Sequence, residues 1–231
     1  MLRSWEELPA FMRTDDVRPY WDILQKKKGQ LVLKRAFDLT AALALTAMAA
    51  VPMAAIAVRI KQDSPGPVFY RQERITTYGK TFRIHKFRTM VTDADKIGTV
   101  VTVGNDARIT RVGEKLRRFR LDELPQLFDV IHGDMSFVGT RPEVPKYVEQ
   151  YRSEYNATLL LPAGITSETS IRFKNEAELL KDVEDVDETY MEIVLPQKMR
   201  WNLESIEHFS FSHELRTMIR TVLAVCGKTY E

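Results

Sequence analysis

The sequence predicts a mostly helical α/β protein in which a broken, re-entrant membrane helix leads into a compact cytosolic domain. Three observations predict this class. An uncharged apolar run extends from Leu39 to Val58 and contains a proline, Pro52. Lysine and arginine residues flank the run on both sides. Beyond it, apolar residues recur mainly at three- and four-residue steps, the helical period, around one short hairpin pattern.

The first segment, residues 1–33, is predicted to be an N-terminal amphipathic arm. Its aromatic and aliphatic side chains, Trp5 and Trp21 among them, are interspersed with charged residues. Tryptophan is favoured at the membrane–water interface. We therefore expect the arm to lie on the membrane surface or on the body of the protein. The sequence does not decide whether it binds lipid or protein.

The second segment, residues 34–61, is predicted to be a re-entrant membrane helix. About 20 apolar residues just cross about 30 Å of hydrocarbon, so a plain span is one alternative, and a buried helix of a soluble protein is another. Pro52, however, lacks an N–H and kinks or breaks a helix. Basic residues on both sides match the excess found on cytoplasmic flanks. We expect a helix broken at Pro52 that returns to the cytoplasmic face, with Lys34 and Arg35 as its anchoring charges at the membrane.

The third segment, residues 62–231, is predicted to form the compact domain. Residues 68–70 and 81–84 have the composition of strands, and the turn signal at residues 78–79 lies between them. This pattern indicates a small β-hairpin.

Amphipathic helices make up the rest of the predicted domain. Residues 110–132 carry apolar side chains at helical spacing and basic side chains on the other faces. A basic amphipathic helix often lies on an anionic membrane surface, although a solvated helix face has the same pattern. Residues 142–155 and 211–226 are two further predicted helices.

The composition limits the function classes. The 34 basic and 32 acidic residues leave a formal net charge of +2, which is too balanced to indicate a nucleic-acid-binding protein. The single cysteine, Cys226, excludes an internal disulfide and fits a reducing, cytosol-facing environment. The four histidines are scattered and lack the spacing of a zinc site.

Two adjacent carboxylates, Asp122 and Glu123, are the strongest chemical signal. Neighbours on a helix point in different directions, so one carboxylate can attack while the other binds a metal or accepts a proton. Pro125 suits a first helical turn and indicates a helix that begins near Asp122, whose dipole would keep both groups ionised. Carboxylates, basic side chains and Mg²⁺ are the components of phosphoryl transfer. An Asp-Glu pair can also serve the helix dipole alone.

Four strings identify a family resemblance. KRAFDL, GPVFYRQERI, TFRIHKFRTM and LDELPQLFDVIHGDMSFVGTRPE, in this order and spacing, resemble the bacterial sugar transferase family. These are the small monotopic phosphoglycosyl transferases, which start glycan assembly on polyprenyl phosphate. The similarity is close over about residues 33–145 and weaker to the end. It implies that residues 62–231 are the catalytic domain, with its active site on the cytoplasmic face of the inner membrane.

The resemblance also implies a reaction. Asp122 is expected to attack the β-phosphate of a UDP-sugar, release UMP and hold the sugar phosphate covalently, after which polyprenyl (undecaprenyl) phosphate attacks that intermediate in a ping-pong mechanism. Mg²⁺ is the expected cofactor, bound at Asp122 and Glu123. The candidate phosphate- and substrate-binding residues are basic: Lys86, Arg88, Arg141 and Arg118. Binding of lipid head groups is the alternative for these charges.

The chain departs from the family pattern in three places. Val51 replaces the serine that often precedes the helix-breaking proline, so the bend is expected to depend on Pro52 alone. The family's GPRP string is Gly-Thr-Arg-Pro at residues 139–142. A segment that usually resembles RPGITGWAQV is LPAGITSET at residues 161–169 and lacks the arginine and tryptophan. We expect this last change to affect recognition of the sugar, or of the nucleotide.

Two other functions stay open on the sequence. One is a non-catalytic membrane partner in glycan assembly or its regulation, because residues 161–169 are altered. The other is a membrane phosphatase or hydrolase that uses Asp122. The sequence does not identify the sugar, nor whether the product is an exopolysaccharide, a capsule, an O-antigen or a glycoprotein glycan. It also does not decide between a monomer and a homodimer.

Overall fold

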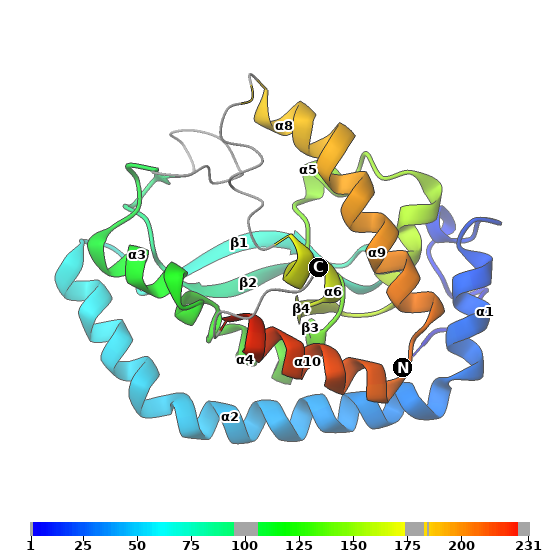
Figure 1. Cartoon of the computed structure of the whole chain (residues 1–231), viewed down its shortest axis with the longest axis horizontal. Coiled ribbons are helices and arrows are strands. Elements are labelled where there is room, and N and C mark those ends of the chain that lie inside the picture. The colour runs from blue at the N-terminus through cyan, green and yellow to red at the C-terminus, as the bar shows by residue number, and fades with distance from the viewer. Residues whose placement is uncertain (1, 95–105, 174–182, 184, 226–231) are drawn as a thin grey trace.

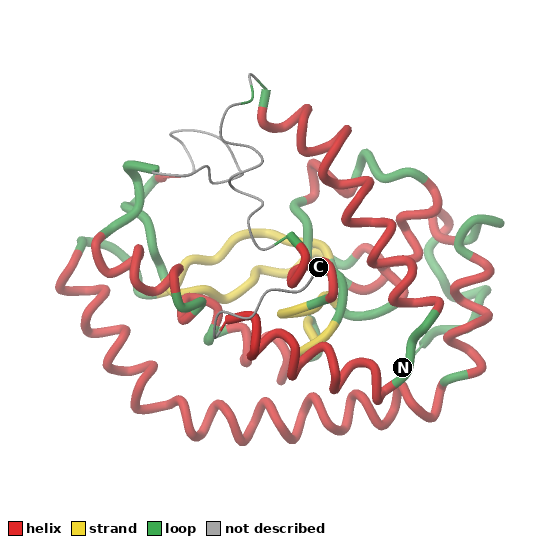
Figure 2. Tube along the Cα trace, in the orientation of Figure 1, coloured by secondary structure: helices red, strands yellow, loops and turns green. Residues whose placement is uncertain are grey.

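One long helix curves around the edge of the molecule, other helices pack beside it, and two small sheets lie toward the middle (Figures 1 and 2). The computed structural model describes residues 2–94, 106–173, 183 and 185–225. Cys226 and the predicted end of the last helix at residue 226 therefore lie outside the described residues.

The long helix, α2, is continuous from Lys28 to Asp63 and contains Pro52. The expected pair of helices separated by a break is therefore wrong at the level of secondary structure, and the helix begins before residue 34. Figure 1 shows that α2 bends instead. Proline removes one hydrogen bond and crowds the preceding turn, which bends a helix when the flanking turns continue on either side.

The apolar run of α2 is exposed. Only 11% of its most apolar window is buried, although the helix is long and apolar enough to cross a membrane. Met48 is 75% exposed and Val51 is 80% exposed. A helix in the core of a soluble protein would bury such side chains, so that alternative is wrong. An exposed apolar surface of this kind is what a helix in contact with lipid presents.

The predicted β-hairpin is confirmed and is longer than expected. Strand β1 (Phe69–Ile75) pairs antiparallel with β2 (Thr81–Phe87). The turn η2 (Thr77–Gly79) joins them, and both Tyr78 and Gly79 have positive φ there. Tyr70 lies opposite Lys86 in this register. The candidate phosphate-binding residue Lys86 is therefore part of the hairpin.

A second sheet was missed from the sequence. Strand β3 (Met135–Val138) pairs in parallel with β4 (Ala163–Thr166). The backbone of β4 and the backbone just beyond β3 approach closely: a Cβ atom on Gly164 would lie 2.2 Å from the backbone nitrogen of Gly139. Glycine is required at this contact, which fixes the loop that carries Arg141.

The predicted helix over residues 110–132 is wrong as a single element. It consists of α3 (Arg111–Arg118), the short turn η4 (Leu121–Glu123) and α4 (Gln126–His132). Arg120 has a left-handed backbone with φ of 53° and ends α3. Pro125 stands at the N-cap of α4, because a proline inside a continuous helix would lose a hydrogen bond.

The predicted helices near the C-terminal end have different outcomes. Residues 142–155 form only the short α5 (Pro145–Val148) and the start of η5 (Ser153–Leu160). The last predicted helix is confirmed as α10 (Phe211–Val225), which lies beside α2. Between them come α6 (Glu168–Arg172), α8 (Val186–Thr189) and α9 (Leu195–Glu207).

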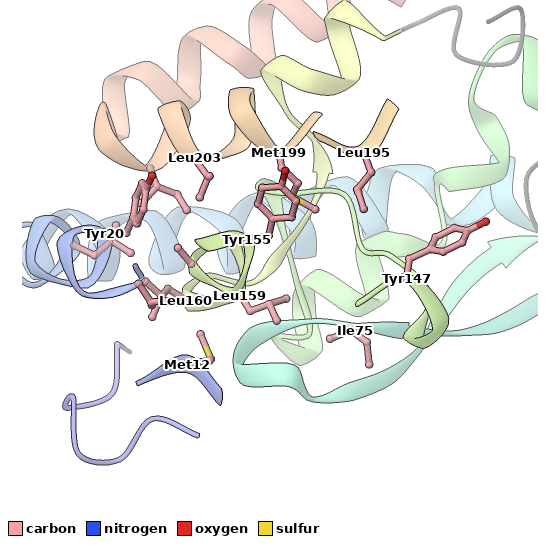
Figure 3. Packing of buried hydrophobic residues seen from close by; sticks show 14 of the residues in the cluster. Met12, Tyr20, Ile75, Tyr147, Tyr155, Leu159, Leu160, Leu195, Met199 and Leu203 are labelled. Carbon is pink, nitrogen blue, oxygen red and sulfur yellow. The ribbon is translucent and has the colours of Figure 1, made fainter. Parts of the chain in front are cut away.

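The N-terminal arm packs on the body. Helix α1 (Arg18–Lys26) and the turn η1 (Ala10–Met12) bury Met12 and Leu24 in the largest hydrophobic cluster, together with Met199 and Leu203 of α9. Figure 3 shows Met12 and Tyr20 directed toward this cluster. Burial of each such side chain contributes about 1.5–3 kcal/mol. The arm is therefore part of the domain's core, and of the two placements expected for it, the one on the protein is found.

Candidate functional site

The carboxylate pair occupies the turn η4, between the hairpin and α4. Asp122 and Glu123 are both buried, at 9% and 8% exposure. The left-handed Arg120 directs the chain into this turn. Asp129 of α4 accepts hydrogen bonds from the backbone N–H of His85 at 2.9 Å and meets its ring Nδ1 at 2.6 Å, which fixes α4 against β2.

Glu123 is surrounded by three cations. Arg141 Nη2 donates to its Oε1 at 2.9 Å, Lys86 Nζ lies 3.3 Å from the same oxygen, and Arg120 Nη1 lies 3.7 Å from Oε2. Burial alone would raise the pKa of Glu123, but Arg141, Lys86 and Arg120 together hold that pKa well below its usual range. Glu123 therefore stays negatively charged and holds three basic side chains close to Asp122.

Asp122 has the opposite environment. Burial raises its pKa above the usual range, while Lys86 partly offsets this effect and the charge of Glu123 adds to it. The expectation of a lowered pKa is therefore wrong for Asp122. The pKa of Glu123 is lowered as expected, but by its three cations, since the pair stands on a short turn rather than at the start of α4. Among the described residues, no group forms a hydrogen bond or ion pair with the Asp122 carboxylate.

Asp122 lines a polar cavity of about 230 Å³. Five basic residues line it: Arg74, Lys86, Arg88, Arg108 and Arg117. Burial lowers the pKa of Lys86 to about 8, although Glu123 favours its charged form. A cavity with this charge suits phosphate oxygens, which arginine binds in pairs.

The sequence reasoning missed several of these cations. Arg74 alternates with Gln72 and Tyr70 along β1, so the two-residue period of a strand places all three on one face, with Tyr70 opposite Lys86. That signal was present in the predicted hairpin. Arg117 and Arg120 were missed because the turn η4, which interrupts the predicted helix beside them, was not expected.

Two predicted phosphate-binding residues have other contacts. The Arg88 guanidinium donates to the carbonyl oxygens of Ser64 at 2.6 Å and Pro65 at 2.7 Å, just beyond the end of α2. It therefore fastens the end of the long helix, although its residue also borders the polar cavity. Arg118 is exposed and stacks over the ring of Phe119 at 5.5 Å, away from the carboxylate pair.

The two predicted anchoring charges point into the protein. Lys34 forms a buried ion pair with Glu214 of α10 and donates to the carbonyl oxygen of Val138 at 2.9 Å. Arg35 donates to the carbonyl oxygens of Val130 and Ile131, at 2.6 and 3.0 Å. A role at the lipid surface is therefore wrong for both residues, since these contacts attach α2 to the domain.

A second cavity, of about 310 Å³, adjoins the carboxylate pair. Glu123 and Arg120 lie at its polar end. Its other walls are mainly apolar and come from α2, α4, β3, β4, α6 and α10: Leu45, Ala49, Leu124, Leu127, Phe137, Ile165, Thr166, Ser170, Ile171, Thr221 and Ala224. Asp122 thus faces the cationic cavity, while its neighbour Glu123 faces the apolar one.

The two carboxylates are the candidate metal ligands. The described residues contain no cluster of three or more acidic, histidine or cysteine side chains. Mg²⁺ is commonly held by one or two carboxylates together with substrate phosphates. Asp122, a buried carboxylate at a cationic cavity, fits that mode, and its oxygens are also placed to attack phosphorus.

A buried acid beside a cationic cavity, next to an exposed apolar helix, is an arrangement suited to an enzyme that transfers phosphorylated groups at a membrane. The comparisons identify the family. The model of the bacterial sugar transferases matches residues 29–228, so this chain belongs to the bacterial sugar transferase family.

Relatives with assigned activities support this membership. A UDP-glucose:undecaprenyl-phosphate glucose-1-phosphate transferase of Caulobacter vibrioides is 35% identical over 192 residues, which is 82% of this chain and 68% of that protein. The Escherichia coli enzyme of the same name is 35% identical over 83% of this chain and 39% of its own length. A UDP-N-acetylgalactosamine-undecaprenyl-phosphate N-acetylgalactosaminephosphotransferase of Aeromonas hydrophila is 43% identical over 53% of this chain and 29% of its own length. This chain thus spans less than half of the last two relatives, and the named sugars differ.

Proposed function

We propose that this protein transfers a sugar 1-phosphate from a UDP-sugar to polyprenyl (undecaprenyl) phosphate, releases UMP and so starts assembly of a bacterial surface glycan. One observation carries the proposal: Asp122 is a buried carboxylate at the wall of a cavity that five basic residues line. Such a group is placed for nucleophilic catalysis on a phosphate. The undecaprenyl-phosphate transferases among the relatives support the choice of substrates.

The reaction proceeds in two displacements. An oxygen of Asp122 attacks the β-phosphorus of the donor, the bond from that phosphorus to the bridging oxygen breaks, and UMP leaves with the electron pair. The sugar phosphate is then bound to Asp122 as an acyl phosphate. A phosphate oxygen of the acceptor lipid attacks the same phosphorus, the bond to Asp122 breaks, and the carboxylate is regenerated as the lipid diphosphate-sugar forms.

The neighbouring charges have separate roles in this proposal. Lys86, Arg74 and Arg117 hold the donor's diphosphate over Asp122 and favour the departure of UMP. Glu123 keeps Lys86 and Arg141 in place through its ion pairs. Asp122 would hold Mg²⁺ together with the donor's phosphates, and the ion would neutralise charge on those phosphates.

The arrangement of α2 supports a re-entrant helix on the cytoplasmic side of the inner membrane. Asp63, at its C-terminal end, accepts a hydrogen bond from the backbone of Val112 at 3.0 Å, and Lys34, near its N-terminal end, pairs with Glu214. A helix that spans the bilayer separates its ends by about 30 Å of hydrocarbon. One domain that contacts both ends is most simply accommodated if both ends lie on the same side.

A UMP-release assay tests the proposed function. Purified protein in detergent or nanodiscs is mixed with Mg²⁺, undecaprenyl phosphate and each of a panel of UDP-sugars. We expect UMP with at least one donor, in amounts that match the lipid product. Release of free sugar phosphate without lipid product would instead indicate a hydrolase. No UMP with any donor would favour a non-catalytic partner.

A further inference from the structure

We propose that the apolar cavity beside Glu123 holds the first isoprene units of the acceptor lipid, and that residues 165–171 select this lipid rather than the donor sugar. The inference rests on the proposed function and adds a binding site to it. The resemblance to the family led us to expect that the altered segment, residues 161–169, affects recognition of the sugar or of the nucleotide. The structure points elsewhere, because no residue of this segment lines the polar cavity within the described chain.

Ile165 and Thr166 of this segment line one wall of the apolar cavity, and Ile171 of α6 continues that wall. The segment is fastened to α10: Thr166 Oγ1 and Thr221 Oγ1 lie 2.7 Å apart, and Arg220 Nη1 donates to Glu168 at 2.6 Å. These bonds hold β4 and α6 against α10, so Glu168, one of the changed residues, affects the wall through the packing of α6.

The size of the cavity suits a short stretch of an isoprenoid chain. A cavity of about 310 Å³ is much smaller than a polyprenyl chain and takes only a short stretch of one. A longer lipid would leave most of its chain outside the protein. The cavity therefore contacts only the isoprene units next to the phosphate.

The two ends of the cavity match the two ends of such a lipid. Arg120, at the polar end, is about half exposed and lies 3.7 Å from Glu123. Its guanidinium carries five N–H donors, more than one ion pair uses, and can therefore also bind a lipid phosphate. At the other end, Leu45 and Ala49 belong to the apolar run of α2, whose neighbours Leu43 and Met48 are exposed. The apolar wall is thus continuous with the surface that α2 offers to the membrane.

The occupant also fits the chemistry of the second displacement. Asp122 faces the cationic cavity and Glu123 the apolar one, and the two residues are adjacent in the same turn. A phosphate bound at Arg120 would lie beside the sugar phosphate held on Asp122. Each substrate then has its own approach to the carboxylate pair, which permits them to react in turn.

Filling the cavity tests the proposal. Ala49→Phe places a ring in it, whereas Ala50→Phe makes the same change at an exposed position of the same helix. Two readouts are needed: the burst of UMP from donor without lipid, and the KM for undecaprenyl phosphate in the complete reaction. We expect Ala49→Phe to raise that KM by about tenfold or more and to leave the burst unchanged. Ala50→Phe should change neither.

Smaller changes keep the test valid if Ala49→Phe fails to fold. Ile165→Ala and Leu45→Ala remove apolar contacts from two walls, and Leu43→Ala removes the same side chain from α2 outside the cavity. We expect the first two to raise the KM for lipid by about threefold to tenfold, with the burst unchanged, and the third to have no effect. A farnesyl phosphate acceptor, which is too short to depend on the bilayer, should show the same pattern.

Two results would overturn the assignment. One is an unchanged KM for lipid in all the cavity variants. The other is loss of the UMP burst in Ile165→Ala, which would show that residues 165–171 contribute to donor binding. Failure of the proposed function is distinct, because the wild-type protein would then give no burst with any UDP-sugar.

Discussion

The pH dependence of the first displacement should report the charge of Lys86. This side chain lies 3.3 Å from Glu123 and lines the cavity that we assign to the donor's phosphates. Burial lowers its pKa from 10.5 to about 8, so the cation predominates below pH 8 and is lost as the pH rises through that value. If only the cation holds the diphosphate, kcat/KM for the donor should fall by about tenfold for each pH unit well above 8.

Arginine at this position should remove the alkaline decline, since a guanidinium stays charged throughout the range. Lys86→Arg is expected to be slower than the wild type at pH 7, because its planar group does not fit the same contacts, yet its profile should be flat near pH 8. Lys80→Arg is the matched control: Lys80 is exposed and pairs with Asp134 at 2.6 Å. It should retain the wild-type profile.

The assay is the initial rate of UMP release at subsaturating donor, from about pH 6.5 to about pH 9.5. Circular dichroism at each pH confirms that the protein stays folded. A decline near pH 8 that persists in Lys86→Arg would show that another group titrates. A wild-type profile without any decline would show that the charge of Lys86 is not needed.

Three further outcomes follow from the structure. Arg88→Met should destabilise the protein by about 1–3 kcal/mol in thermal unfolding, since the carbonyl groups at the end of α2 lose their hydrogen-bond donor. The KM for donor should stay unchanged, and a large rise in that KM would show that Arg88 binds phosphate. Gly164→Ala should cost about 1–3 kcal/mol or more because its Cβ meets the backbone of Gly139, whereas Gly29→Ala has open space and should not destabilise. Cysteine labels at residues 33 and 62 should both react from the cytoplasmic side, and labelling from opposite sides would refute the re-entrant helix.

Local patterns predicted the parts of the fold that depend on near neighbours. The hairpin followed from strand composition around the turn at Tyr78 and Gly79. The exposed helix followed from the uncharged run around Pro52. The closeness of Lys86, Asp122, Glu123 and Arg141 was expected only from the family resemblance, and the structure does bring Lys86 and Arg141 to Glu123.

The rest depends on contacts between distant residues. The parallel pairing of β3 with β4 joins Met135 to Ala163 and has no local signature. The same holds for Arg88, whose charge suggested phosphate until its contacts with the end of α2 were seen. Lys34 looked like a membrane charge because its partner, Glu214, is far away in sequence. A side chain's charge was visible in the sequence, but its direction was not.

The central claim is that Asp122 carries the sugar phosphate. Intact and peptide mass spectrometry, after the active protein is mixed with its UDP-sugar and Mg²⁺ but no lipid, tests it most directly. The adduct should appear on the peptide that spans residues 121–130, disappear when undecaprenyl phosphate is added, and be absent in Asp122→Asn. An active preparation that never yields the adduct, or that yields it on another residue, would contradict the claim.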